Sequence, residues 1–223
     1  MNEPKRRPRP LLECHALTKD YGSTRALGPI DLEIGFGETV ALVGHNGSGK
    51  STLLSLIAGF IEATDGWVAI TGGPAGDEES RATVSYVPDT PVFYDDLSLG
   101  EHLEYLSRLH GTTPAEQHTD ALLEAFGLEK RIDDLPTDFS RGLRQKAGLT
   151  VAVCRPYRLL LIDEPFSGLD AKGKQTLLDL LAQVKAGGGT VIVATHDDAV
   201  MQAFDRVITL AEGELVSDTG AAA

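Results

Sequence analysis

The sequence is poor in cysteine, aromatic residues and positive charge. Its 223 residues include two cysteines, 6% aromatic residues, and 20 lysines and arginines against 33 aspartates and glutamates. Cys14 and Cys154 fit no CxxC or other metal-ligand spacing, so we expect both to be small buried core residues. The net charge of −13 would repel a phosphate backbone, and we therefore expect no nucleic-acid partner.

The sequence also lacks a long hydrophobic run. No window approaches the roughly 18 consecutive apolar residues of a membrane-spanning helix, so a role at a membrane would need a partner that crosses it. The N-terminal segment carries Lys5, Arg6, Arg7 and Arg9 but no apolar stretch of the kind found in secretory signals. We therefore predict a disordered basic arm over residues 1–10 of a cytosolic protein, and a frayed tail over residues 218–223.

Short β-rich runs alternate with helical stretches between these ends. This order predicts an α/β domain with a largely buried sheet. The predicted strands lie at 39–43, 67–70, 84–87, 159–163, 191–194 and 207–210.

The stretch 98–152 differs because it contains two helix-start patterns and no convincing strand. Ser98 with Glu101 forms a capping-box pattern, and Thr113, Pro114 and Glu116 form a second start. We therefore predict one domain over 11–217, with a core at about 11–88 and 155–217 and a helical subdomain inserted at about 89–154.

A glycine-rich segment directly follows the predicted strand at 39–43 and precedes a predicted helix at 52–58. It matches the pattern GxxxxGK[ST], in which glycines let successive backbone N–H groups turn into one concavity that binds a triphosphate. Lys50 would reach the β and γ phosphates of ATP, and Ser51 would ligate Mg²⁺. The residues predicted to bind the nucleotide here are Gly44, His45, Asn46, Gly47, Ser48, Gly49, Lys50, Ser51 and Thr52.

Two carboxylates end the apolar run at 159–163. Asp163 is the last residue of that run and Glu164 follows it, which places both at the carboxyl edge of the sheet, where ligand sites of α/β proteins lie. Asp163 suits a Mg²⁺ ligand, and Glu164 could accept the proton of a water that attacks the γ phosphate. The alternative interpretation, two solvated charges at a strand end, is disfavoured by the phosphate-loop motif.

Together these motifs resemble the nucleotide-binding subunits of ABC transporters over roughly residues 11–216. The segment 165–170 resembles the D-loop of the family, with Asp170 at the position that communicates across a dimer. His196 resembles the switch residue that contacts the γ phosphate, and Tyr21 lies where the family stacks an aromatic ring on adenine. The resemblance implies a P-loop NTPase (RecA-like) core with an antiparallel β subdomain and an inserted α-helical subdomain.

The segment 139–145 resembles the signature sequence of this family. Ser140, Gly142 and Gln145 match it, whereas Arg141 replaces its first glycine. Ser140 would cap a helix whose N-terminal amides face the γ phosphate bound by the other subunit of a dimer. Asp89 stands where the family usually has glutamine, and its carboxylate is a further candidate ligand for Mg²⁺.

The resemblance implies the ATP-hydrolysing subunit of an ABC transporter, working as a homodimer or heterodimer around two Mg²⁺–ATP complexes. Its other partner would be a transmembrane permease that holds it at the cytoplasmic face of the membrane. Asp89 is similar to the acidic residue of many ABC-2-type exporter subunits and so favours export.

Three alternatives remain at this point: an importer subunit, a soluble ABC ATPase acting on ribosomes or DNA, and a P-loop kinase. The soluble ATPases generally carry tandem copies or basic surfaces, whereas this sequence has one copy of the motifs and a net charge of −13. A kinase would leave Ser140, Asp170 and His196 without a role. The transported substrate is not encoded in these motifs.

Overall fold

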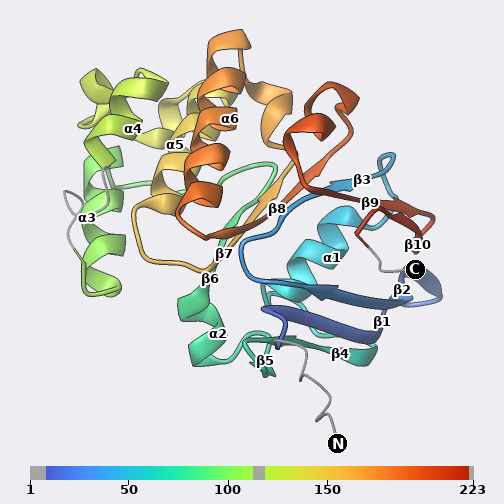
Figure 1. The fold of residues 1–223 in the computed structure, drawn as a ribbon. Coiled ribbons are helices and arrows are strands. Elements are labelled where there is room, and N and C mark those ends of the chain that lie inside the picture. Colours follow the sequence, from blue (N-terminus) through green and yellow to red (C-terminus); the bar gives the residue numbers. More distant parts are fainter. Residues whose placement is uncertain (1–8, 113–118, 221–223) are drawn as a thin grey trace, which may run out of the picture.

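The computed structural model describes residues 9–112 and 119–220, which form two β-sheets and a group of helices (Figure 1). The smaller sheet has the strand order β2-β1-β4-β5 and is antiparallel. A two-residue turn joins its two long strands and leaves Tyr21 at the tip of the hairpin. Its strands are β1 (Leu12–Tyr21), β2 (Thr24–Ile34), β4 (Asp65–Ile70) and β5 (Gly73–Pro74).

The larger sheet has the strand order β10-β9-β3-β8-β7-β6 and is parallel except for β10 at its edge. Every residue of β3, β7 and β8 is buried, as expected for central strands of a parallel sheet. The six predicted strands are confirmed, three of them with small extensions. The strands of this sheet are β3 (Thr39–Val43), β6 (Val84–Val87), β7 (Leu159–Asp163), β8 (Thr190–Thr195), β9 (Arg206–Ala211) and β10 (Glu214–Asp218). The sixth predicted strand, at 67–70, is β4 of the smaller sheet, and β10 was not predicted.

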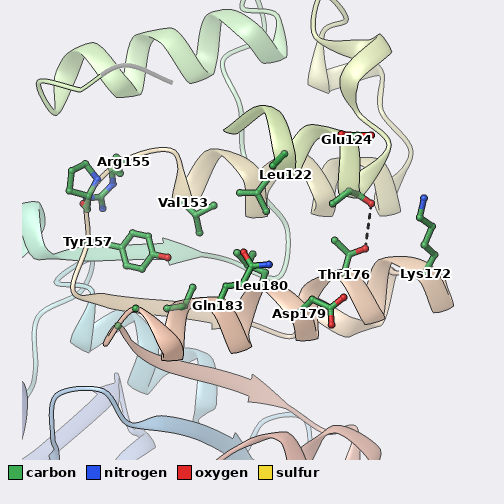
Figure 2. Close-up of a pocket in the computed structure, with 16 residues that line it drawn as sticks. Leu122, Glu124, Val153, Arg155, Tyr157, Lys172, Thr176, Asp179, Leu180 and Gln183 are labelled. Atoms are coloured by element: carbon green, nitrogen blue, oxygen red, sulfur yellow. Dashed lines mark hydrogen bonds between the residues drawn. The ribbon is translucent and has the colours of Figure 1, made fainter. Parts of the chain in front are cut away.

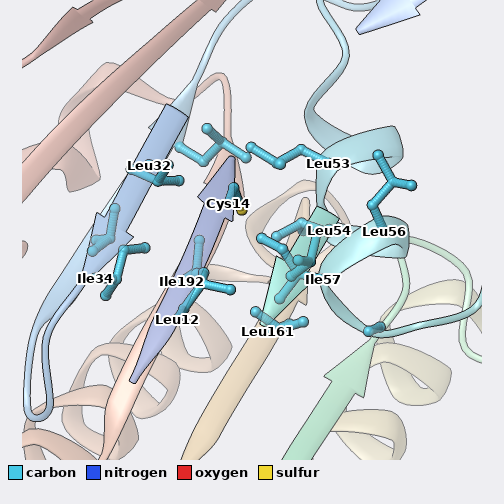
Figure 3. Packing of buried hydrophobic residues seen from close by; sticks show 14 of the residues in the cluster. Leu12, Cys14, Leu32, Ile34, Leu53, Leu54, Leu56, Ile57, Leu161 and Ile192 are labelled. Carbon is cyan, nitrogen blue, oxygen red and sulfur yellow. The ribbon is translucent and has the colours of Figure 1, made fainter. Parts of the chain in front are cut away.

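Helix α1 (Lys50–Ile57) packs between the two sheets. Leu53, Leu54 and Ile57 of this helix share one apolar cluster with Leu12 of β1 and Leu161 of β7 (Figure 3). The cluster explains the position of the phosphate loop, because the loop must connect β3 to a helix held against the same sheet.

The other face of the larger sheet is covered by α5 (Arg141–Val153) and α6 (Ala171–Ala186). Successive residues of β7 face opposite clusters: Leu161 faces α1, whereas Leu160 and Ile162 face the helices on the other side. A strand covered on both faces is apolar throughout, which is why the sequence shows it as a continuous run.

The helical part contains α3 (Leu99–Leu109), α4 (Thr119–Phe126) and α5, with no strand among its described residues. The capping box of Ser98 and Glu101 is confirmed, with both reciprocal bonds present. The predicted cap formed by Thr113, Pro114 and Glu116 lies outside the described residues. Short elements complete the chain: α2 (Glu78–Thr83), η2 (Glu129–Arg131), η3 (Pro136–Asp138), η4 (Pro165–Gly168) and η5 (Asp198–Ala203).

The predicted frayed tail is wrong for its first residues. Asp218 belongs to β10 and pairs with Arg206, at 2.7 Å between Oδ2 and Nη2. The Thr219 backbone N–H donates to the carbonyl of Val207, and the Thr219 hydroxyl accepts from the N–H of the same residue. An edge strand thus holds this end, although its sequence lacks an apolar run.

Cys14 and Cys154 are both free and buried, as predicted. Burial raises the pKa of the Cys14 thiol to about 12, so this side chain is an unreactive core thiol. Within the described part of the chain, none of the helices combines the length and apolar character needed to cross a bilayer.

Candidate functional site

The phosphate loop lies between the end of β3 and the start of α1. A Cβ at Gly44 would lie 2.3 Å from the carbonyl oxygen of Leu210, and one at Gly49 would lie 2.9 Å from that of Ala26. Gly49 also has a left-handed φ of 102°. As the cap residue of α1, it has no side chain that could accept a hydrogen bond from the first-turn amides of that helix. Glycine is therefore required at both positions, and the first-turn amides remain available to an anion.

The loop exposes one part and buries another. His45, Asn46 and Gly47 are exposed, whereas Ser48 is buried and its hydroxyl has no hydrogen-bond partner. Ser51 and Thr52 follow in the first turn of α1. The exposed part of the loop is thus accessible to a nucleotide.

Lys50 is almost fully buried, with 5% of its side chain exposed. Its ammonium donates to the carbonyl oxygens of Gly44, at 2.7 Å, and His45, at 3.2 Å. It also lies 3.3 Å from Oε1 of Glu164. This oxygen has no partner of hydrogen-bond geometry, so the contact is an ion pair, and the charge of Lys50 is aimed at the interior of the loop.

Asp163 and Ser51 form the part of the site that suits a divalent cation. Asp163 is buried, and its Oδ1 has no hydrogen-bond partner. Burial raises the pKa of Asp163, the hydrogen bond to Ser51 lowers it, and the charges of Glu164 and Asp89 raise it further. A buried carboxylate oxygen without a partner, beside a serine hydroxyl, fits the hard oxygen donors that Mg²⁺ requires.

Glu164 is held between Lys50 and His196. Its Oε2 accepts a hydrogen bond from Nδ1 of His196 at 2.8 Å, while its backbone N–H donates to the carbonyl of Ala194 at 2.9 Å. Glu164 has a φ of 46°, a left-handed conformation that is unfavourable for a residue with a side chain. The strand end therefore directs the carboxylate toward the phosphate loop and away from the core.

The signature residues lie at the start of α5 and differ in exposure. Ser140 is exposed and caps the helix, its Oγ accepting from the N–H of Leu143 at 3.4 Å. Gly142 fits closely, because a Cβ there would lie 2.6 Å from the carbonyl oxygen of Gly168. Gln145 is buried, so within one protomer it does not share the exposed surface of Ser140.

The remaining predicted residues lie at separate positions. Tyr21 is 52% exposed, with the ammonium of Lys19 5.2 Å from its ring centroid. Asp170 caps α6 and accepts from Lys146, a contact that lowers its pKa. Asp89 lies 3.4 Å from the guanidinium of Arg141.

The structure therefore brings together Lys50, Ser51, Asp163, Glu164 and His196. Among the described contacts of a single protomer, none joins this group to Ser140, Gly142, Asp170 or Tyr21.

Three contacting residues were missed by sequence reasoning. Lys146 pairs with Asp170 at 3.1 Å, Lys174 pairs with Asp197 at 3.1 Å, and the hydroxyl of Ser167 contacts Arg141. Ser167 lies inside the D-loop-like segment and could have been noticed there. The two lysines carry no such signal, because their partners are distant in sequence.

A cavity of about 980 Å³ lies elsewhere, between α4, the end of α5 and α6 (Figure 2). Leu122, Tyr157 and Leu180 are among the side chains that line it, and none of its lining residues was predicted as a site residue. Burial raises the pKa of Tyr157 to about 12, so its hydroxyl stays neutral. This cavity includes no residue of the phosphate loop.

Comparisons with known proteins identify the family of this chain. A family model described as ABC transporter matches residues 27–167. The ABC-type transporter ATP-binding protein EcsA of Bacillus subtilis is 35% identical over 92% of this chain and 85% of its own length. The SkfA peptide export ATP-binding protein SkfE of the same organism is 31% identical over 93% of this chain and 88% of its own length.

Solved structures give the same result. An ATP-binding subunit of an ABC transporter superposes with a TM-score of 0.88 at 34% identity, over 93% of this chain and 89% of that one. A dimeric ATP-binding cassette in a post-hydrolysis state, bound to ADP and Pi, has a TM-score of 0.82 at 27% identity, over 93% of this chain and 97% of that one. With the phosphate loop and the paired carboxylates in place, this chain belongs to the ABC transporter family, as one of its ATP-binding and ATP-hydrolysing subunits.

Proposed function

We propose that two copies of this chain, or one copy and a related subunit, close over two Mg²⁺–ATP complexes. The observation that carries the proposal is the convergence of Lys50, Ser51, Asp163, Glu164 and His196 in one protomer, while the capped start of α5 faces solvent. Each nucleotide would lie between the phosphate loop of one protomer and Ser140 and Gly142 of the other. Asp170, at the start of α6, would communicate across the same interface.

Within each site, the roles follow from the contacts. Tyr21 would stack on the adenine, and Lys50 would exchange its carbonyl partners for the β and γ phosphates. Ser51 and Asp163 would hold Mg²⁺, with Asp89 as a further ligand. When bound, Mg²⁺ neutralises part of the charge on the β and γ phosphates.

Glu164 would accept a proton from the attacking water as its oxygen bonds to the γ phosphorus and the bond to ADP breaks, giving ADP and Pi. His196 would fix the orientation of this carboxylate through its Nδ1–H. The opposite nitrogen, Nε2, would contact the γ phosphate by donating a hydrogen bond, for which it must carry the second proton of the ring. Loss of the γ phosphoryl group removes the charge that bridges the two protomers, so the dimer would open.

The permease would dock beside the helical part. A groove of about 610 Å³ lies there, lined by Phe60, Tyr86, Pro91, Val92 and Phe93 among others. Phe60 is 66% exposed and Val92 is 88% exposed, which is unusual for large apolar side chains without a partner. The groove includes Pro88, which immediately precedes Asp89, so docking and the ATP site would be connected.

Export is the direction that we propose, with the chain at the cytoplasmic face of the membrane. Asp89 supports it, and so do relatives named for export, including SkfE and a macrolide export protein, MacB, of Marinobacter nauticus, which is 34% identical over 96% of this chain. This chain spans 35% of the length of that MacB protein.

The substitution Glu164→Gln tests the proposal. The variant is expected to bind ATP with unchanged affinity, to hydrolyse it at least about 100-fold more slowly, and to elute as a dimer on size exclusion with Mg²⁺–ATP. Glu129→Gln, on the exposed η2 segment, is the matched control and should behave as wild type. Near-normal hydrolysis would remove Glu164 as the base, and a variant that stays monomeric with ATP would contradict the shared site.

A further inference from the structure

Arg141 stands where the family signature has a glycine, and its side chain bridges two loops. Its Nη2 donates to Oγ of Ser167 at 3.0 Å and to Oδ1 of Asp89 at 3.4 Å. Ser167 lies in η4, after β7, and Asp89 lies in the loop after β6. One guanidinium nitrogen therefore joins the first residue of α5 to the ends of two neighbouring strands.

The backbone beside Arg141 is seated on the same η4 segment. A Cβ at Gly142 would lie 2.6 Å from the carbonyl oxygen of Gly168, and a Cβ at Gly168 would lie 3.6 Å from Cγ of Arg141. The start of α5 thus packs backbone to backbone against η4, and Arg141 lies across that contact. A shift of either loop must therefore reach the start of α5, where Ser140 is exposed.

The Arg141–Asp89 pair is poorly suited to stabilising the fold. The two side chains are 67% and 47% exposed, and ion pairs of this kind contribute little to stability. Exposure also makes the pair easy to exchange.

We propose that Arg141 is a positioning residue that couples the two ATP sites of the dimer through Asp89. The inference rests on the proposed function, in which Asp89 contacts Mg²⁺ in its own protomer while Ser140 contacts the nucleotide of the other. Asp89 cannot give its full charge to a guanidinium and to a divalent cation at once. The Asp89–Arg141 bond is therefore weaker in the Mg²⁺–ATP state, and the guanidinium of Arg141 then bonds chiefly to Ser167.

A double-mutant cycle tests this coupling without relying on hydrolysis. Mg²⁺ is titrated into mixtures of a fluorescent ATP analogue with wild type, Arg141→Ala, Asp89→Ala and the double variant. Removal of Arg141 frees Asp89 for the metal, so the half-saturating Mg²⁺ concentration is expected to fall about two- to fivefold. In the Asp89→Ala background, the same removal is expected to change nothing.

Two further variants separate positioning from packing. Arg141→Met keeps most of the side-chain stem beside Gly168 but removes the charge, so it should give the same shift as Arg141→Ala, while Arg141→Lys should restore part of the wild-type value. Arg131→Ala removes an exposed arginine whose partner, Asp134, lies 3.0 Å away in the same helical part, and it should leave the Mg²⁺ dependence unchanged.

The outcomes distinguish a failure of the coupling through Arg141 from a failure of the proposed function. Equal shifts with and without Asp89, or no shift for Arg141→Met, would overturn the coupling through Arg141 while the proposed function stands. Failure of the wild-type chain to bind the ATP analogue in the presence of Mg²⁺ would contradict both.

Discussion

Lys50 combines near-complete burial with carbonyl partners supplied by its own loop. Lys50→Ala removes the charge that would contact the β and γ phosphates, so ATP affinity measured by calorimetric titration is expected to fall roughly 100-fold or more. The fold should remain intact, because the apolar cluster that holds α1 between the sheets does not include this side chain. Lys172→Ala, an exposed lysine on α6, is the control. Unchanged affinity in Lys50→Ala would refute the assignment of the phosphate loop.

The raised pKa of Asp163 predicts that the free energy of unfolding of the ATP-free protein depends on pH. Its pKa is raised, chiefly by burial, so the folded state favours the protonated form. The cost of the charged form is absent below the ordinary pKa of an aspartate and grows as the pH rises through the folded pKa. Asp163→Asn is therefore expected to raise the free energy of unfolding at pH 7 by roughly 1 kcal/mol.

The measurement for Asp163 is urea unfolding at several pH values. The advantage of Asp163→Asn should shrink as the pH is lowered toward about 4, and the variant should lose Mg²⁺-dependent hydrolysis. Asp133→Asn, an exposed carboxylate, serves as the control. An asparagine variant less stable than wild type at pH 7 would show that this carboxylate has partners that compensate its burial.

At the scale of elements, the start of α3 is held by two reciprocal bonds. Ser98 Oγ accepts from the N–H of Glu101 at 3.2 Å, and the Glu101 carboxylate accepts from the N–H of Ser98 at 2.7 Å. Ser98→Ala is expected to lower the free energy of unfolding by about 1 kcal/mol. Chemical denaturation measures this, and ATP affinity should not change, since the cap is remote from the phosphate loop. Ser217→Ala, on the edge strand β10, is a comparison without a helix cap.

The strands that stand out most clearly in the sequence are the central strands of the larger sheet, which are buried on both faces. The middle residues of β7 and β8 are apolar because each strand contacts both core clusters, and only the strand ends carry polar residues. β1 and β2 were missed because their pairing contains register shifts that interrupt the alternation of exposed and buried residues. The residues of the edge strand β10 are all partly or fully exposed, so no alternation of apolar and polar residues marks this strand in the sequence.

The candidate site divides in the same way. Residues that act from one contiguous segment, such as Lys50 with Ser51 and Asp163 with Glu164, could be predicted because the motif itself encodes their spacing. The contact of Arg141 with Asp89 could not, since the two residues are 52 positions apart in sequence. Only the packing of α5 on η4 brings them together.

At the scale of the whole molecule, the exposed apolar groove predicts where the chain meets the membrane. Phe60→Asp and Val92→Asp place charge on that groove, so the chain, expressed in its native cell, is expected to move from the membrane fraction to the soluble fraction. ATP hydrolysis by the isolated chain should stay near wild type. Val216→Asp changes another exposed apolar residue, on β10, and is the control. Groove variants that still sediment with membranes would contradict the docking surface.

The internal partners of Lys50 have a consequence for turnover. Its ammonium bonds to the carbonyl oxygens of Gly44 and His45 and lies beside Glu164, so an incoming phosphate would replace ligands that the chain itself supplies. ATP binding is therefore an exchange of ligands on Lys50, and the carbonyl oxygens return to the ammonium when the product leaves. The Lys50 ammonium is therefore never left without ligands between cycles. This lowers the free-energy barrier to ADP release.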